Sequence, residues 1–375
     1  MRKIPAYIIA ICIVLLALLP PKFIEIDCTV NSTLWLWATI AAGFLAFMFV
    51  FTKANAWIKA IVVYSYINCF LSKAPYLSFT IYFSVIAVAY LYLLCLSITD
   101  WEPIFRTIQS LFLLSVLFII LQTFGKDSLL NFGKTTPVFY GTIFNSMILA
   151  SYLTCLSPFL LARNKLYLVP LVILVFMSRS SGMALSLVAG TIFYLFFKIR
   201  NKVAYMVVVV MLILGALTYA YYDGQIANLM APGAESRVLV WIKTAQLVNE
   251  NPYTGWGVGT FKTIFPVISN YMIAETGTPV MWFRLHNCWL QFIFEMGYIG
   301  FAFILGLVGY LIWLFKRAFK TEQVILCMTG LVIYGSNMLI HFPTRMTSVV
   351  LILIGFIVYY ETMLKREVRD VRFKA

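Results

Sequence analysis

Residues 203–221 of the chain are VAYMVVVVMLILGALTYAY, an apolar run that directly follows a basic stretch. A helix of about 20 mostly apolar residues matches the thickness of the hydrocarbon core of a bilayer. The run contains no charged residue and shows no alternation of polar and apolar positions, which favours a helix over a barrel strand. This stretch predicts a membrane-spanning helix, and similar runs recur along the chain.

The composition of the whole chain is that of a protein whose solvent includes lipid. Of its 375 residues, 62% are hydrophobic and 11% are charged, with a mean hydropathy of +0.93. Soluble domains are nearer half apolar and a quarter charged. We therefore expect an all-α polytopic membrane protein with about twelve transmembrane helices. The expected spans are residues 4–20, 34–52, 57–71, 76–98, 104–124, 138–162, 166–178, 181–198, 203–221, 288–314, 323–341 and 346–361.

The basic residues predict the orientation of these spans. Most of the 28 Lys and Arg residues fall in short loops on one side, which the positive-inside rule assigns to the cytoplasm. Both termini then lie in the cytoplasm. The first apolar run, which follows Arg2 and Lys3, lacks a small-residue cleavage site and is expected to be a retained helix. The net charge of +14 marks topology, so no nucleic acid is predicted as a partner.

One connection differs from the others and divides the chain into three parts. Residues 1–221 hold nine expected helices, residues 222–287 form a long polar loop on the outer face, and residues 288–375 hold three helices and a basic cytoplasmic tail. Long loops of this kind are usually functional. Within the loop, residues 235–251 predict an amphipathic helix that Pro252 ends. The predicted apolar face consists of Val238, Trp241, Ala245 and Val248.

A glycine-rich stretch follows this predicted helix, over residues 251–261, with Gly255, Gly257 and Gly259. One interpretation is a tight turn that lets Trp256 and Phe261 pack. The other is a nest of backbone N–H groups that binds an anion. The stretch is not a dinucleotide fingerprint between a strand and a helix, and we favour the turn.

The expected outer face gathers basic residues that run against the charge bias. They are Arg179, Arg237, Arg284, Arg345, His286 and His341. Charges at the membrane boundary are costly unless they are paired or used. Arginine suits phosphate, and histidine suits a general base near neutral pH. Together they fit attack by a hydroxyl on a carbon whose leaving group is a lipid-linked phosphate, which arginines would stabilise.

Acidic and cysteine residues do not predict a metal or cofactor. The outer acids form no paired-Asp motif and no carboxylate–His cluster, and no CxxC spacing occurs. Glu295 lies inside an expected span, and an ionisable residue there is a functional hypothesis by default. The alternative is that Glu295 is a buried partner for an Arg or a hydroxyl.

Taken in order, several motifs resemble the O-antigen ligase and O-antigen polymerase family of membrane glycosyltransferases. The similar region covers about residues 139–350. It contains the stretch 139–145, Ser178-Arg179, Ser236-Arg237 with Trp241, Asn251-Pro252 through Phe261, His286-Asn287 with Glu295, Gly297 and Gly300, and Phe342-Pro343-Thr344-Arg345.

This resemblance implies a multi-pass enzyme of the bacterial inner (cytoplasmic) membrane with its active face in the periplasm. It would move a glycan from undecaprenyl pyrophosphate to an acceptor hydroxyl without a metal. By resemblance, His286 would be the catalytic base. Arg179, Arg237, Arg284 and Arg345 would hold the pyrophosphate. Supporting roles would fall to Asn287, Glu295, Trp241, Gly255, Gly257, Gly259 and His341.

Several functions remain open at this point. The first is a ligase that transfers O-antigen to the lipid A–core oligosaccharide. A polymerase of O-antigen or capsule repeat units would use the same donor, as would a protein O-oligosaccharyltransferase. A transporter or flippase without chemistry is the alternative of another class, although the sequence shows no internal repeat.

Overall fold

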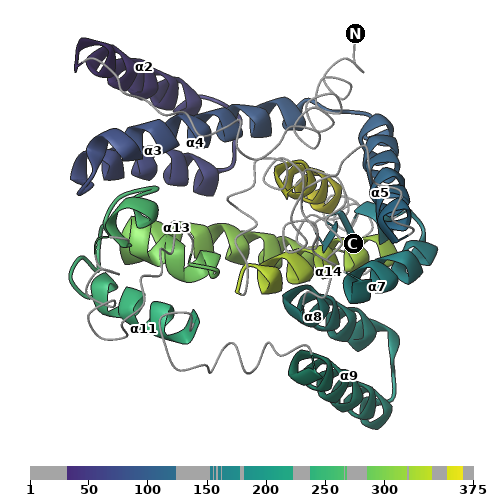
Figure 1. Cartoon of the computed structure of the whole chain (residues 1–375). Coiled ribbons are helices and arrows are strands. Elements are labelled where there is room, and N and C mark those ends of the chain that lie inside the picture. Colours follow the sequence, from purple (N-terminus) through teal and green to yellow (C-terminus); the bar gives the residue numbers. More distant parts are fainter. Residues whose placement is uncertain are drawn as a thin grey trace. The chain divides into compact units, whose positions relative to one another are not determined.

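The computed structural model describes residues 32–123, most of residues 153–177, and residues 181–222, 237–265, 267, 285–318, 321–339 and 353–365. All regular structure within these residues is helical (Figure 1), so the predicted all-α class is confirmed for this part of the chain. The chain forms two compact units. Met1–Glu25, Cys95–Gln225 and Arg317–Ala375 make the first unit, and Ile26–Leu94 and Ile226–Lys316 make the second.

The described helices follow the predicted spans closely, and the predicted total of about twelve spans stays a prediction. The first unit contains α5 (Glu102–Thr123), the short η3 (Lys165–Tyr167), α7 (Leu168–Met177), α8 (Ser181–Lys198), α9 (Lys202–Tyr222), α14 (Glu322–Asn337) and a helix over residues 353–365. The second unit contains α2 (Ser32–Val50), α3 (Ala56–Leu71), α4 (Pro75–Leu96), α11 (Arg237–Val248) and α13 (Cys288–Arg317), apart from the last residues of α4 and α13. The predicted span 4–20, most of 138–162 and the first part of 346–361 lie outside the described residues.

Two helices among the described residues, α4 and α13, are long and apolar enough to cross a membrane. Apolar stretches of α2, α3, α8 and α9 are shorter. On α9, large apolar side chains are exposed, with Val203 73% and Met211 68% accessible. Exposed apolar surface of this kind fits contact with lipid.

Local sequence signals set the start of several helices. In each case an Asn or Thr side-chain oxygen accepts a hydrogen bond from a backbone N–H two or three residues further on, which satisfies a donor that the helix itself leaves unpaired. The pairs are Asn55 with Trp57 N at 2.9 Å, Asn201 with Val203 N at 2.9 Å, Asn287 with Leu290 N at 3.0 Å, and Thr321 with Val324 N at 3.3 Å.

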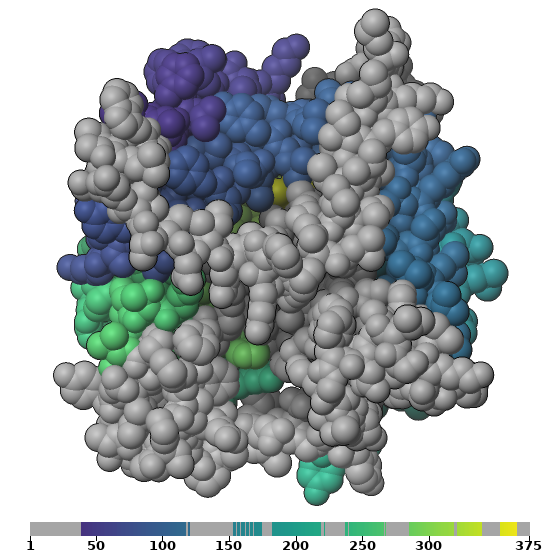
Figure 2. Space-filling view, turned by 45° about the horizontal axis from the view of Figure 1, so that its top comes forward, coloured from purple at the N-terminus to yellow at the C-terminus, as the bar shows by residue number. Residues whose placement is uncertain are grey.

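In the second unit, tyrosine hydroxyls join α2, α3 and α4, which lie side by side (Figures 1 and 2). Each hydroxyl donates to a backbone carbonyl of the neighbouring helix. The bonds are Tyr66 to Thr39 O at 3.2 Å, Tyr82 to Val62 O at 3.1 Å, and Tyr90 to Leu45 O at 3.0 Å. Such bonds supply partners for the hydroxyls within an otherwise apolar layer.

Two glycines of α13 let α3 pack against it closely. A Cβ atom at Gly300 would lie 2.6 Å from Cε1 of Tyr64, and one at Gly306 would lie 2.7 Å from Cη2 of Trp57. Small residues at such contacts are typical of helices that pack in membranes. α3 is therefore held along α13 by ring-on-glycine contacts.

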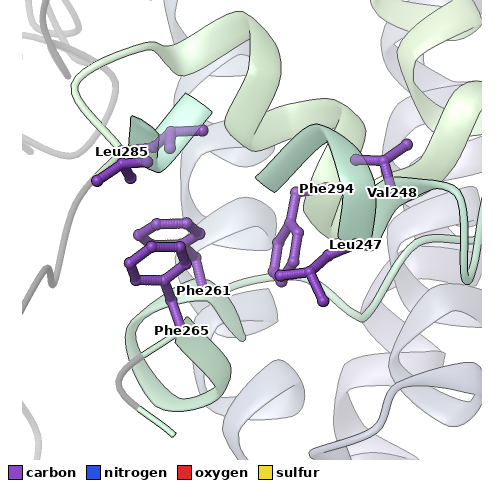
Figure 3. Packing of buried hydrophobic residues seen from close by; sticks show 7 residues of the cluster. Leu247, Val248, Phe261, Phe265, Leu285 and Phe294 are labelled. Carbon is purple, nitrogen blue, oxygen red and sulfur yellow. The ribbon is translucent and has the colours of Figure 1, made fainter. Parts of the chain in front are cut away.

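The long loop packs onto α13 through one apolar core. Val240, Leu247 and Val248 of α11, Phe261, Phe265, Leu285 and Phe294 are buried together. Figure 3 shows Phe261 and Phe265 stacked beside Leu285, with ring centroids 4.8 Å apart. Phe294 meets Phe261 edge-on at 5.5 Å. This core fixes α11 and the start of α13 as one body.

The predicted apolar face of the loop helix was wrong in part. Ala245 is exposed, and the buried positions of α11 are Val240, Thr244, Leu247 and Val248. Apolar residues occur on both sides of this helix, since Ile242 is also exposed, so periodicity alone could not choose between them. The helix ends at Val248, earlier than predicted, and tighter i to i−3 bonds continue up to Pro252.

Candidate functional site

The helix α13 is broken at Gly297, where φ is 66° and ψ is −176°. The prediction of one continuous helix over residues 288–314 was therefore wrong at this point. A Cβ atom at Gly297 would lie 2.6 Å from the Gly255 N atom and would collide with Tyr253 O. Only glycine adopts this backbone region readily, so the break depends on residue 297.

The break takes three carbonyl groups of α13 away from their helical N–H partners. Each of them accepts another hydrogen bond instead. Phe294 O accepts from Trp256 N at 2.9 Å, Glu295 O from Gly257 N at 2.9 Å, and Met296 O from the Tyr64 hydroxyl at 2.7 Å. These replacements matter because an unpaired backbone group in an apolar environment is costly.

Two N–H groups that follow the break find partners in the loop. Tyr298 N donates to Pro252 O at 2.8 Å, and Ile299 N donates to Tyr253 O at 3.3 Å. The glycine-rich segment, residues 251–261, therefore replaces the missing turn of α13 on both sides of the break.

The N–H groups of the glycine-rich segment point to acceptors inside the protein. Gly255 N donates to Asn251 O, Val258 N to the side chain of Asn68, and Gly259 N to Glu295 Oε2 at 2.9 Å. With the two bonds to α13, all five N–H groups from residue 255 to 259 are engaged. The segment is thus a tight turn, as favoured from the sequence, and the Glu295 side chain is one of the acceptors of its N–H groups.

Glu295 is a buried carboxylate, 2% exposed, that joins the segment to α13. Its Oε1 atom accepts from Gln291 Nε2 at 2.8 Å, one turn earlier, while Oε2 accepts from Gly259 N. A backbone N–H and a side-chain amide are therefore among its partners. Carboxylates that accept N–H bonds in this way hold loops firmly.

His286 lies at a sharp corner just before α13. Its φ is 54°, and it is the one non-glycine residue with positive φ in the described part of the chain. Asn287 begins the helix, since its side chain caps Leu290 N and its carbonyl accepts from Gln291 N. The Nδ1 atom of His286 is enclosed by protein. A non-glycine residue in this conformation is strained by about 1–3 kcal/mol, and such strain is typical of functional sites.

The helix α11 reaches this corner through Trp241, and Arg237 lies one turn earlier on the same helix. Trp241 Nε1 donates to Leu285 O at 2.9 Å, directly before His286. Arg237 lies four residues earlier on α11 and so shares the face of Trp241. Its guanidinium is half-buried, and burial lowers its pKa from the usual value. No carboxylate in the described ranges forms an ion pair with Arg237.

The structure brings together part of the predicted site. Trp241, His286 and Asn287 meet at the corner, with Arg237 one turn before Trp241 on α11, and Gly255, Gly257, Gly259 and Glu295 meet at the break in α13. Arg179, Arg284, His341 and Arg345 lie outside the described residues and stay predictions. Over the described ranges, no three His, Cys, Asp or Glu side chains come together as a metal site would need.

Sequence reasoning missed Tyr64, Asn68 and Gln291, which bond to the break or to the glycine-rich segment. Asn68 is the clearest omission, because an amide inside the apolar run 57–71 needs a buried partner. The polar amide of Asn68 within this apolar run could have indicated a buried hydrogen-bonding site.

The part of the chain that carries this geometry matches a known family. Residues 166–305 match the family model described as O-antigen ligase. Over these residues, the chain is similar to the O-antigen ligase family. The matched O-antigen ligase region contains Arg237, Trp241, the glycine-rich segment, His286 and Glu295. No curated protein matches the chain by sequence.

O-antigen ligase family members are bacterial membrane proteins, and the apolar helices α4 and α13 fit this. They are ligase- or polymerase-type glycosyltransferases that use a lipid-linked glycan donor and a lipid-linked acceptor. The strained histidine corner and the half-buried arginine thus lie within the matched residues.

Proposed function

We propose that the chain transfers a glycan from undecaprenyl pyrophosphate to a hydroxyl of the lipid A–core oligosaccharide, on the periplasmic face of the bacterial inner membrane. The observation that carries the proposal is the conformation of His286. Its backbone has φ 54° and lies between Leu285, which Trp241 anchors, and the helix-capping Asn287. A general base must be held in place, and an anchored backbone contributes to this.

In the proposed reaction, His286 acts on the acceptor. Because Nδ1 is enclosed, Nε2 takes the proton of the acceptor hydroxyl. The hydroxyl oxygen forms a bond to the anomeric carbon of the glycan as the bond from that carbon to the pyrophosphate oxygen breaks. The electron pair leaves with undecaprenyl pyrophosphate. No metal takes part in this scheme, and both termini lie in the cytoplasm.

The leaving pyrophosphate must be stabilised by cations, and Arg237 is the first of these. Its partial burial disfavours an isolated charge, and a bound anion would compensate that cost. We assign Arg179, Arg284 and Arg345 to the same pyrophosphate on the basis of sequence. A bidentate guanidinium suits phosphate oxygens better than an ammonium does.

The break in α13 is compatible with this function and offers little to a transporter. Broken helices of transporters expose backbone groups to a substrate cavity. Here the carbonyls and N–H groups at Gly297 bond to the glycine-rich segment and Tyr64. A polymerase of repeat units, by contrast, would use the same donor and the same base, and differs only in its acceptor.

The lipopolysaccharide banding pattern of a deletion strain tests the proposal and separates these acceptors. The strain is complemented with the wild-type chain or with His286→Asn. If the chain is a ligase, the deletion strain and the strain with His286→Asn lose O-antigen from the core, and long chains accumulate on the lipid carrier. The wild-type chain restores the O-antigen on the core. A core that carries single repeat units would identify a polymerase instead. An unchanged pattern would contradict both and direct attention to capsule, protein glycosylation or transport.

Arg237 gives a prediction about charge geometry. We expect Arg237→Gln to lower the transfer rate by about 10²-fold or more, as loss of a preorganised donor does elsewhere. Arg237→Lys should also be impaired, because a point charge cannot make two parallel bonds. The measurement is the initial rate of transfer in isolated membranes, with Lys243→Gln on the same helix as a charge-matched control. Full activity of Arg237→Lys would refute bidentate binding.

Trp241 gives a prediction about the anchoring of the corner. Trp241→Phe removes the bond to Leu285 O and should cost about 1 kcal/mol of stability. It should also lower the transfer rate per folded molecule by about tenfold, because small misplacements of a base are expensive. Tyr90→Phe removes a similar bond between α4 and α2 and should keep its rate. Equal rates for the two variants would show that Trp241 contributes only stability.

A further inference from the structure

We infer that the corner between α3 and α4, residues 64–78, positions the catalytic histidine through Tyr64 and Asn68. This corner lies outside the O-antigen ligase match and carries no motif in the sequence. The inference rests on the proposed function, because Tyr64 and Asn68 affect transfer only by holding His286 in position. They are positioning residues, because neither one contacts the reacting groups in the proposed scheme.

Asn68 holds both arms of the glycine-rich turn. Its side chain is fully buried at 0% exposure. Its Nδ2 atom donates to Thr254 O at 2.5 Å, and its Oδ1 atom accepts from Val258 N at 3.0 Å. One amide therefore satisfies an acceptor and a donor on opposite sides of Gly257, as a neighbouring strand would do.

Tyr64 holds the break in α13. Its hydroxyl lies 2.7 Å from Met296 O and 3.4 Å from Tyr253 O, so it contacts α13 and the glycine-rich segment together. Its ring packs where a side chain at Gly300 would stand. Tyr64 thus replaces the helical donor that the break removes from Met296.

The turn that follows α3 adds contacts to the same segment. Lys73 N donates to Trp256 O at 3.0 Å, and Ser72 Oγ contacts the same carbonyl at 3.3 Å. Ser72 and Ser78 share a bond of 2.7 Å between their hydroxyls at the place that a side chain on Gly257 would fill. The corner therefore fits the segment by shape as well as by hydrogen bonds.

The glycine-rich segment is linked to His286 through the first part of α13. It is bonded to residues 294–299 on both sides of the break, and Phe261 packs against Phe294 in the core that includes Leu285. The first part of α13, residues 288–296, begins immediately after the His286 corner. A looser segment would let this part of α13, and with it His286, change direction.

The test compares three conservative variants in the full-length protein, purified and reconstituted in liposomes. Tyr64→Phe and Asn68→Ala remove the proposed bonds. Tyr82→Phe removes a buried bond of the same kind, from a hydroxyl to Val62 O, in the same helix layer but away from the segment. Amide hydrogen exchange is followed over residues 253–259 and 285–293, and kcat and KM for the lipid-linked donor are measured in parallel.

We expect Tyr64→Phe and Asn68→Ala to speed exchange about tenfold in both regions, because each loses bonds that close the segment. Their kcat per folded molecule should fall by about 10–100-fold with an unchanged KM. Tyr82→Phe should match the wild type in both regions and in kcat. Unchanged exchange over residues 285–293, or an equal effect of Tyr82→Phe, would overturn the inference. If the wild type itself transfers no glycan, the proposed function fails, and the exchange rates alone decide whether the corner is coupled to residues 285–293.

Discussion

His286→Asn will lower the rate of glycan transfer by about 10²–10⁴-fold, the usual contribution of a general base. Asparagine removes the imidazole but tolerates positive φ better than most residues, so the corner at φ 54° should persist. The comparison uses initial rates in isolated membranes, expressed per folded molecule. The thermal midpoint of the variant should stay close to that of the wild type.

His286→Gly separates chemistry from strain at the same position. Glycine adopts positive φ without cost, so this variant should be as stable as the wild type or more stable by about 1 kcal/mol. It should nevertheless be as inactive as His286→Asn. A protein that gains stability and loses activity is the expected sign of a strained functional residue. Substantial transfer by either variant would remove His286 from the mechanism.

Gly297→Ala will destabilise the protein by at least about 3 kcal/mol, because a side chain there faces both a forbidden backbone region and a collision. The Cβ atom would meet Tyr253 O and Gly255 N. The variant must either unfold locally or straighten α13, and both outcomes detach the glycine-rich segment. Transfer should fall to background, and the thermal midpoint in detergent should drop clearly.

Gly309→Ala is the matched control on the same helix. Nothing lies within 4 Å of the position that its Cβ atom would take, and the backbone there is helical. Alanine should therefore stabilise α13 by about 0.5–1 kcal/mol and leave transfer unchanged. If Gly297→Ala behaves like Gly309→Ala in stability and rate, the break is not needed for the fold or for the site.

The helical segments could be predicted from sequence because their signals are local. Charged residues border α8 and α9, and side-chain caps such as Asn201 and Thr321 mark where helices begin. Residue type also singled out Arg237 and His286. A guanidinium and an imidazole next to apolar spans are costly unless they are paired or used, whatever the fold around them.

The break at Gly297 could not be predicted in this way. A glycine in an apolar run is compatible with a helix, and here the decision depends on partners that are distant in sequence. The segment around Gly257 lies some forty residues earlier, and Tyr64 lies more than two hundred residues earlier. The buried face of α11 was predicted incorrectly for a related reason. This face is set by tertiary packing against Phe261 and Phe294.

The most direct test of metal-free transfer with His286 as the base is the reaction of the purified chain in liposomes, with an undecaprenyl-pyrophosphate-linked glycan, lipid A–core acceptor and EDTA. We expect the wild type to form the glycan–core product, and His286→Asn to form about a hundredth of it or less at equal thermal stability. If the wild type forms no product, or His286→Asn gives the same yield, His286 is not the base of this reaction or the reaction is not the one proposed.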